Sequence, residues 1–115
     1  MAAQMVRTFQ YAIAILFTAL SAAAYGADTA QLRSRGHRLL QDHCGRCHAI
    51  EAKGGSPLKG APPMRAIYMR FAPKELQAEL REGMVSKHRD MPQIDFSDED
   101  TDAIMAYLYG LAVRK

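Results

Sequence analysis

Residues 42–50 read DHCGRCHAI and contain both cysteines of the chain, Cys44 and Cys47, with Gly45 and Arg46 between them. A cysteine pair at this spacing is typical of a redox dithiol, of part of a metal site, or of a point where a haem is attached. These three alternatives predict three different proteins. The residues around the pair have to distinguish between them.

The start of the chain has the layout of a signal peptide. Arg7 is followed by the mostly apolar run FQYAIAILFTALSAAA, and small residues at Ala24 and Gly26 suit the positions three and one before a cleavage. We therefore expect residues 1–26 to be a cleaved signal peptide, with Ala24 or Ala27 as alternative ends. An uncleaved membrane anchor is less consistent, because the run is shorter than the ~20 residues that a spanning helix needs.

This leader predicts that residues 27–115 form a single exported domain in the periplasm. The whole chain of 115 residues carries 15 basic and 12 acidic side chains, and such a balance does not argue for nucleic-acid binding. Outside the reducing cytosol two thiols tend to oxidise, but a disulfide between Cys44 and Cys47 would close a very small loop and remove little unfolded-state entropy. A purely structural disulfide therefore explains the pair poorly.

The expected domain reads as short helices joined by loops rich in glycine and proline. No alternating run is long enough for a strand, so the sequence predicts an all-α fold. Asp28 or Thr29 is predicted to cap a first helix, which delivers Cys44 at its end. The expected inward face of this helix contains Leu32, Gly36, Leu39, Leu40 and His43.

Further helices are predicted after the cysteine motif. A short helix is expected over residues 64–71, Pro73 suits the first turn of the next helix, and Gly83 suits its end. Ser97, followed three residues later by Asp100, resembles a capping box at the start of the last helix. The expected inward residues of these helices are Met64, Ile67, Tyr68, Phe71, Leu76, Leu80, Ile104, Tyr107, Leu108 and Leu111.

The cysteine motif continues into His48, so that residues 44–48 read CGRCH. In a C-x-x-C-H motif the two thiols add to the two vinyl groups of a haem, and the histidine reaches the iron from one face. A thioredoxin-like dithiol would need a βαβ surround in which the first thiol opens a helix. A zinc site needs four ligands, and Cys44, Cys47, His48 and His43 do not have the spacing of one. We therefore interpret Cys44 and Cys47 as the attachment points of a haem.

Met91 is the predicted second axial ligand of the iron. Its thioether is a soft, neutral ligand, and the following Pro92 stiffens the loop that presents it. Met84 competes, but it continues an apolar helical spacing and is interpreted as a packing residue, while His88 would give a bis-histidine centre. The remaining candidates are interpreted as structural: His37 as a surface residue, His43 as a partly buried residue at a helix end, and Met64, Met69 and Met105 as packing or surface residues.

Together these features resemble class I cytochromes c, which are small exported electron carriers with haem attached near the mature N-terminus. The resemblance covers the whole expected domain. GHRLLQDHCGRCHAI resembles the first helix and haem site of the family, APPM its proline loop, and MPQIDFSDEDTDAIMAYLYGL its ligand loop and last helix. More narrowly, CHAI, SP, APP, EG, H and DMP in this order resemble a short alphaproteobacterial subgroup.

The resemblance implies one covalent haem c and a cytochrome c fold in which the N- and C-terminal helices cross. It implies that Gly36 and Leu40 meet Tyr107 at this crossing, where only a glycine permits the close approach. The haem pocket and its surroundings are expected to comprise Pro62, Met64, Leu40, Gly36 and Tyr107.

The resemblance also implies that a proline carbonyl accepts a hydrogen bond from the ligand histidine His48, which fixes its ring. Pro62 stands at the matching position. Pro63 follows it directly and Pro57 lies nearby, so the sequence leaves open which carbonyl serves.

The function implied by the resemblance is that of a one-electron carrier and not of an enzyme. With both axial positions of the iron filled no substrate reaches it, and a neutral sulfur ligand favours the reduced state. Larger redox proteins would dock transiently on a monomer, at the exposed haem edge beside Cys44, Arg46 and the loop near Pro63. The alternative is a haem protein with an open or labile sixth position that binds ligands or acts like a peroxidase.

Overall fold

The chain divides into two compact units, and the candidate site lies in the second. The computed structural model describes residue 26, residues 28–83 and residues 90–113. The units are Met1–Ala30 and Gln31–Lys115. The predicted signal peptide and the interpretations of Met84 and His88 lie outside the described residues.

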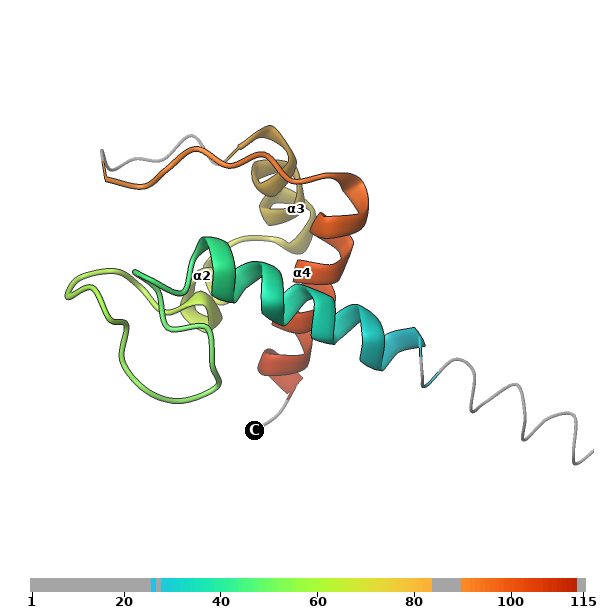
Figure 1. Ribbon diagram of the computed structural model, residues 1–115, viewed down its shortest axis with the longest axis horizontal. Coiled ribbons are helices and arrows are strands. Elements are labelled where there is room, and N and C mark those ends of the chain that lie inside the picture. The colour runs from blue at the N-terminus through green and yellow to red at the C-terminus, as the bar shows by residue number, and fades with distance from the viewer. Residues whose placement is uncertain (1–25, 27, 84–89, 114–115) are drawn as a thin grey trace, which may run out of the picture. The chain divides into compact units, whose positions relative to one another are not determined.

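The described residues form helices joined by loops, and they contain no strand (Figure 1). The first helix ends at residue 43. It is followed by α2 (Met64–Arg70), α3 (Pro73–Glu82) and α4 (Asp98–Val113). The predicted all-α fold is thereby confirmed, and the predicted helices after the cysteine motif are all present.

The first helix and α4 cross at Gly36, and Figure 1 shows the first helix in front of α4. A Cβ atom added to this buried glycine would lie 2.0 Å from the Ala103 carbonyl oxygen and 2.5 Å from its carbon. No real side chain tolerates such distances, so the crossing requires glycine. Tyr107, which the resemblance placed at the crossing, lies one turn further along α4 than Ala103.

Two details of the first helix differ from the prediction. Asp28 and Thr29 already have helical backbone, so neither is the non-helical residue that a cap before the first turn requires. Leu32 remains 38% exposed, whereas Leu40 is fully buried. Helices that cross at an angle diverge away from the contact, and a residue one turn before Gly36 is therefore only partly covered.

Proline and glycine set the limits of α3, as predicted. Pro73 occupies its first turn, where the missing N–H would have had no helical partner. Gly83 follows the last helical residue with φ 71°, in the left-handed region that favours glycine.

Acidic residues gather at the start of α4. The Asp100 N–H donates to Ser97 Oγ at 3.1 Å, which confirms this half of the predicted capping box. Acidic residues fill the first turn, at the positive end of the helix dipole. Asp100 also pairs with Arg35 of the first helix, and Asp98 pairs with Arg81 of α3. These carboxylates therefore have structural partners.

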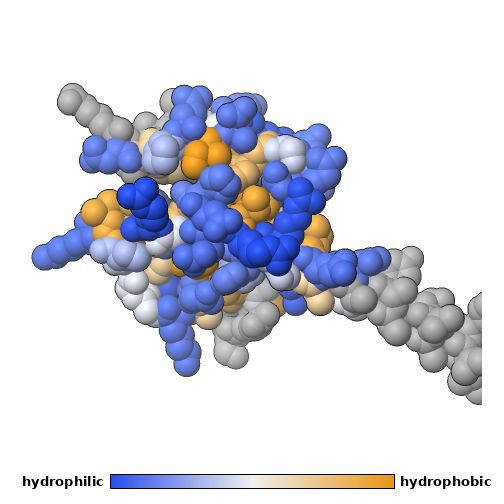
Figure 2. All heavy atoms as spheres, in the orientation of Figure 1, coloured by the Kyte–Doolittle hydropathy of each residue, from blue (hydrophilic) through white to orange (hydrophobic). Residues whose placement is uncertain are grey.

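One hydrophobic core joins all four helices and the chain that follows the cysteine motif. Its fully or nearly fully buried members are Leu40, Ile50, Met64, Ile67, Leu76, Leu80, Ile104 and Leu108. Burying each such side chain stabilises the fold by roughly 1.5–3 kcal/mol relative to leaving it exposed. Polar residues cover most of the face drawn in Figure 2, with apolar atoms visible between them. Among the described residues, no helix is long and apolar enough to span a bilayer.

Candidate functional site

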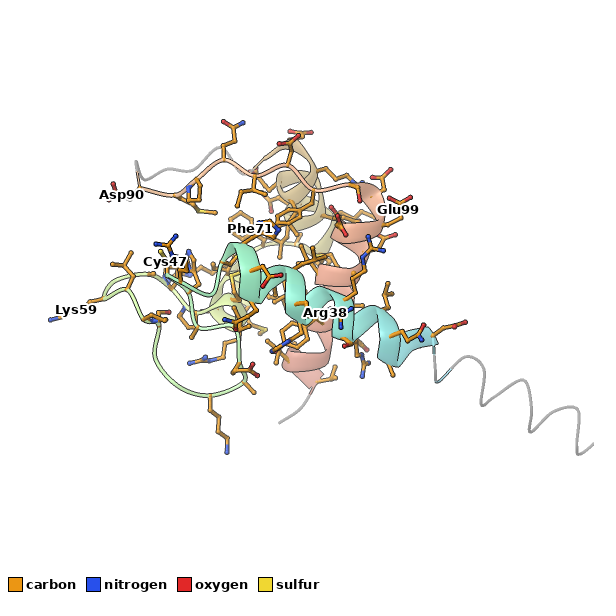
Figure 3. The ribbon with its side chains drawn as sticks, viewed as in Figure 1. Arg38, Cys47, Lys59, Phe71, Asp90 and Glu99 are labelled. Atoms are coloured by element: carbon orange, nitrogen blue, oxygen red, sulfur yellow. The ribbon has the colours of Figure 1, made fainter. Side chains whose placement is uncertain are left out.

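A cavity of about 460 Å³ lies between the turn after the first helix and the loop before α4. Figure 3 shows Cys47 and Lys59 on one side of this region and Asp90 on the opposite side. The volume falls within the usual range of ligand sites, roughly 300–1,000 Å³. The predicted haem-binding residues that line it are Cys44, Cys47, His48, Met64 and Met91.

A tight turn at the end of the first helix brings the two thiols together. The Cys44 and Gly45 N–H groups both donate to the Leu40 carbonyl at 2.8 Å, and the Cys47 and His48 N–H groups donate to the Cys44 carbonyl at 3.1 and 2.9 Å. The spacing of two residues is therefore one turn of chain. Both cysteines and the histidine consequently reach the same cavity from a single, hydrogen-bonded turn.

The cysteines are half-buried, and Cys44 lacks the property expected of a reactive dithiol. Both are free. Burial, and secondarily the neighbouring Cys47, raises the pKa of the Cys44 thiol to about 11. A disulfide oxidoreductase requires a thiol whose pKa is lowered, because the thiolate is the nucleophile. The geometry therefore disfavours the thioredoxin-like alternative.

His48 is 6% exposed, and its ring is fixed by one short hydrogen bond. Its Nδ1 lies 2.6 Å from the carbonyl oxygen of Pro62. A carbonyl oxygen only accepts, so Nδ1 carries the proton and donates, and Nε2 of the neutral ring keeps its lone pair. This is the arrangement in which a metal-binding histidine is usually held. Of the prolines that the sequence left as alternatives, Pro62 makes the bond.

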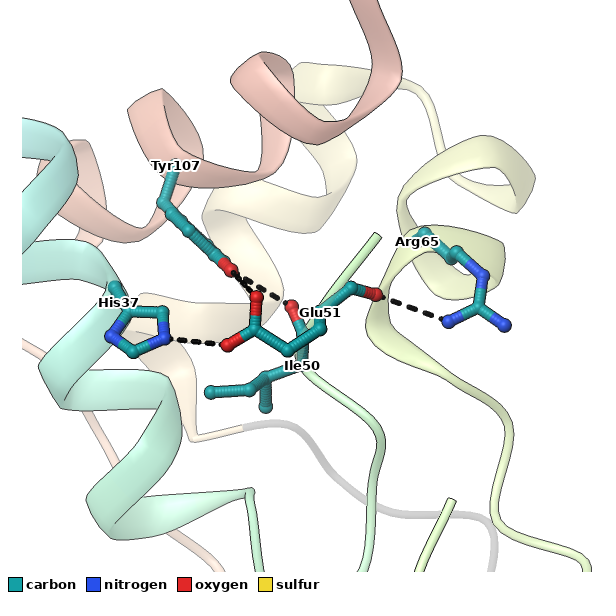
Figure 4. A network of polar contacts seen from close by, with 5 residues as sticks. All are labelled: His37, Ile50, Glu51, Arg65 and Tyr107. Carbon is teal, nitrogen blue, oxygen red and sulfur yellow. Dashed lines mark hydrogen bonds and ion pairs between the residues drawn. The ribbon is translucent and has the colours of Figure 1, made fainter. Parts of the chain in front are cut away.

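The three residues after His48 are held by three donors that come from α2 and α4. The Ala49 carbonyl accepts from Met64 N–H at 2.9 Å. The Ile50 carbonyl accepts from the Tyr107 hydroxyl at 3.1 Å, and the Glu51 carbonyl accepts from Arg65 Nη1 at 3.1 Å (Figure 4). Three successive carbonyls are thus bonded to the start of α2, to α4 and to α2 again. Each carbonyl of the three residues that follow the histidine therefore has a hydrogen-bond partner.

Met91 faces the cavity from the opposite side and is half-buried. It belongs to an extended loop that leads to α4. In this loop the Phe96 N–H donates to the carbonyl of Leu80 in α3 at 3.0 Å. The His43 ring meets the Phe96 ring edge-on, with centroids 5.4 Å apart. His43 is exposed, so the interpretation as a partly buried residue was wrong, because the helix ends there and its last turn faces the cavity rim and not the core.

Other predicted residues lie around the cavity at different depths. Met64 is 3% exposed and lines the cavity, while Leu40 is fully buried in the core beneath the turn. Gly36 and Tyr107 belong to the crossing of the first helix and α4, away from the cavity lining. Their contacts are with the backbone, at Ala103 for Gly36 and at Ile50 for Tyr107.

Sequence reasoning missed a polar cluster next to the histidine. Glu51 Oε1 lies 2.7 Å from Nε2 of His37, which is interpreted from the sequence as a surface residue. Arg65 donates to two carbonyls of the following loop, those of Glu51 and Gly54. Ser56 Oγ accepts from the buried Ala49 N–H at 3.0 Å. No spacing rule relates these residues, and only an acidic residue three positions after the histidine, in a largely basic region, could have drawn attention to the cluster.

The donor set of the cavity fits a c-type haem. Two free thiols on one turn suit the two thioether bonds, and the buried imidazole with Nδ1 already donating leaves Nε2 for an iron. Cys44 and Cys47 would hold the porphyrin edge and His48 would hold the iron. Met64 and Leu80 provide apolar walls.

Comparison with known protein families gives a match over most of the chain. The family model described as "Cytochrome C oxidase, cbb3-type, subunit III" matches residues 31–108. That range includes the cysteine turn, the proline loop, Met91 and most of α4. No curated protein and no solved structure matches the chain.

Proposed function

Because this chain belongs to the cytochrome c domain family of cbb3-type oxidase subunit III, we propose that it carries single electrons on one haem. A cytochrome c domain binds haem c covalently, and the haem iron supplies the electron transfer. Cys44 and Cys47 are the proposed attachment points. His48 and Met91 are the proposed axial ligands. The finer resemblance to class I cytochromes c is part of the same proposal.

The hydrogen bond between His48 Nδ1 and the Pro62 carbonyl is the observation that carries this proposal. It fixes the ring of a buried histidine with the proton on Nδ1, so that Nε2 is available to bind a metal. Any buried histidine needs a hydrogen-bond partner, so the bond is informative because it leaves Nε2 available in a ring that lines the cavity beside two free thiols. The bond also raises the basicity of the ring, which strengthens its hold on a metal.

Met91 supports the carrier function because its thioether carries no charge. The cavity around it also has apolar walls, and both features favour the less charged ferrous state over the ferric state. A methionine on one side and a histidine on the other leave no position for a substrate. We therefore propose an electron carrier with a positive potential that catalyses no reaction of its own.

We propose the location and the partners from the leader at the start of the sequence and from the family match. Residues 1–26 would direct export and be cleaved, and residues 27–115 would work in the periplasm as a monomer. Redox partners would dock transiently at the cavity mouth, where Arg46 and Asp90 lie among the lining residues. The family name makes a terminal oxidase one candidate partner.

The alternative function is ligand binding or peroxidase-like chemistry at an open sixth position. The observation in its favour is the loop that carries Met91. Within its described residues 90–96, one backbone hydrogen bond, from Phe96, ties it to the rest of the protein. A loop held so weakly permits a labile ligand.

Replacing Met91 by alanine separates the two functions. In the wild-type ferric protein we expect a methionine–iron absorption band and slow cyanide uptake. Met91→Ala should keep the haem attached, lose the band, take up cyanide rapidly and have a lower potential. Met69→Ala is the matched control, because Met69 is 74% exposed and should change none of these.

Two results would contradict the proposal. Rapid cyanide uptake by the wild-type protein at neutral pH would favour the alternative function. Loss of the methionine–iron band in Met84→Ala, with the band retained in Met91→Ala, would move the ligand to Met84.

A further inference from the structure

The polar cluster beside His48 joins both terminal helices to the chain that leaves the histidine. The Tyr107 hydroxyl donates to the Ile50 carbonyl at 3.1 Å and lies 3.3 Å from Glu51 Oε2 (Figure 4). Glu51 Oε1 lies 2.7 Å from Nε2 of His37 on the first helix. The His37 and Tyr107 rings also meet edge-on, with centroids 5.2 Å apart.

These contacts fix the hydroxyl in space. The aromatic ring of Tyr107 is set against His37, and the carboxylate of Glu51 lies next to its oxygen on the other side. A hydroxyl has one proton, and the shorter contact is the one to the Ile50 carbonyl. Tyr107 therefore holds one particular peptide unit, which begins two residues after the histidine.

The ring of His48 depends on that peptide unit. One end of the imidazole is held by the Pro62 carbonyl through Nδ1. The other end is its own backbone, whose N–H donates to the Cys44 carbonyl and whose onward chain is held at Ala49, Ile50 and Glu51. Of these restraints, the one at Ile50 comes from α4.

We propose that Tyr107 is a positioning residue for the axial histidine His48. The proposal rests on the proposed haem function and goes beyond it, because it assigns to a hydroxyl at the helix crossing an effect on the iron. The hydroxyl keeps the Ile50 carbonyl in place, and thereby keeps the plane of the imidazole in one orientation. Ring orientation and basicity in turn set the properties of the metal that the histidine binds.

The pair Tyr107→Phe and Tyr109→Phe tests this in the haem-loaded protein. Tyr109 lies on the same helix, two residues away, and is 55% exposed, so its hydroxyl is a matched control. The readouts are the reduction potential and the pattern of shifted haem-methyl proton resonances in the ferric form, which reports the orientation of the axial ligand plane. Tyr107→Phe should shift both, and Tyr109→Phe should shift neither.

Other outcomes overturn the proposal. If Tyr107→Phe only lowers the unfolding temperature and leaves the potential and the resonance pattern unchanged, the hydroxyl has a structural role alone. Glu51→Gln removes a charge but keeps an acceptor for Tyr107. If it reproduces the full potential shift without changing the resonance pattern, charge and not position is responsible.

The failure of the proposed function would look different. It would appear in the wild-type protein as rapid cyanide uptake or as absence of the methionine–iron band. A five-coordinate iron bound by His48 would still show a difference between Tyr107→Phe and Tyr109→Phe if Tyr107 positions the ring.

Discussion

The two sides of the cavity are held in different ways. On the side of His48, the Leu58 N–H donates to the Cys47 carbonyl, the Ala49 N–H to Ser56, and the Met64 N–H back to Ala49. On the opposite side, the described residues 90–96 have a single backbone hydrogen bond to the rest of the protein. The protein therefore builds one side of the site from its own contacts.

This difference teaches where the fold depends on its cofactor. The histidine side is held without further bonds, because its peptide groups and Nδ1 of its imidazole already have partners. The loop of Met91, which is held at Phe96, would gain a tie at residue 91 if the sulfur bound an iron in the cavity. We therefore expect the histidine side to be set by folding, and the methionine side by ligation.

Amide hydrogen exchange should reveal this difference most strongly. In the haem-loaded protein we expect the amides of residues 47–49 to exchange about a thousandfold more slowly than those of residues 93–95, because the former open only when much of the fold opens. NMR-detected exchange measures both sets, with Leu108 in the core as an internal reference. Equal protection of the two segments would remove the distinction.

Gly36→Ala should damage the histidine side through α4. The added Cβ would overlap the Ala103 carbonyl, so the helices must separate and carry Tyr107 away from Ile50. We expect the free energy of unfolding to fall by about 3 kcal/mol, as for overpacked cores. Urea unfolding measures it, with Gly55→Ala as the control, since no atom lies within 4 Å of a Cβ added at Gly55. Equal losses in both variants would show that the crossing is not tight.

Ser56→Ala should have a smaller and more local effect. It removes the acceptor of the Ala49 N–H, a group of a residue that is 8% exposed, and a buried donor left unpaired costs about 1.5 kcal/mol. The exposed Ser34 also accepts a hydrogen bond, from Arg38, and Ser34→Ala is the control that should cost little. Exchange of the Ala49 amide should rise in Ser56→Ala. A loss no larger than that of the control would mean that water replaces the hydroxyl.

Local signals in the sequence were sufficient for much of the fold. Pro73 and Gly83 mark the ends of α3 by their backbone restrictions, and Ser97 marks the start of α4 by its hydroxyl. The spacing of Ile104 and Leu108 identified the buried face of the last helix. These predictions succeeded because each depends on residues within one or two turns.

For the candidate site, too, the sequence allowed predictions only about residues that are close to one another along the chain. The turn of Cys44 to His48 is local and was recognised, while Glu51 and His37 meet across 14 positions that no periodicity connects. His43 was misjudged because the end of a helix, not its face, decides its exposure. A similar argument applies to Leu32, whose cover depends on the angle at which two helices cross.

The crossing at Gly36 also bears on how the chain is made. Arg35 and Asp100, which pair beside it, are 65 positions apart, and Tyr107 and Ile50 are 57 positions apart. A contact between such distant residues costs loop-closure entropy, and it can offset that cost only after both residues have been synthesised. A growing chain that still lacks α4 has no partner for Gly36. Until the last helix has been synthesised, the first helix and the Ile50 carbonyl therefore lack the contacts that α4 supplies.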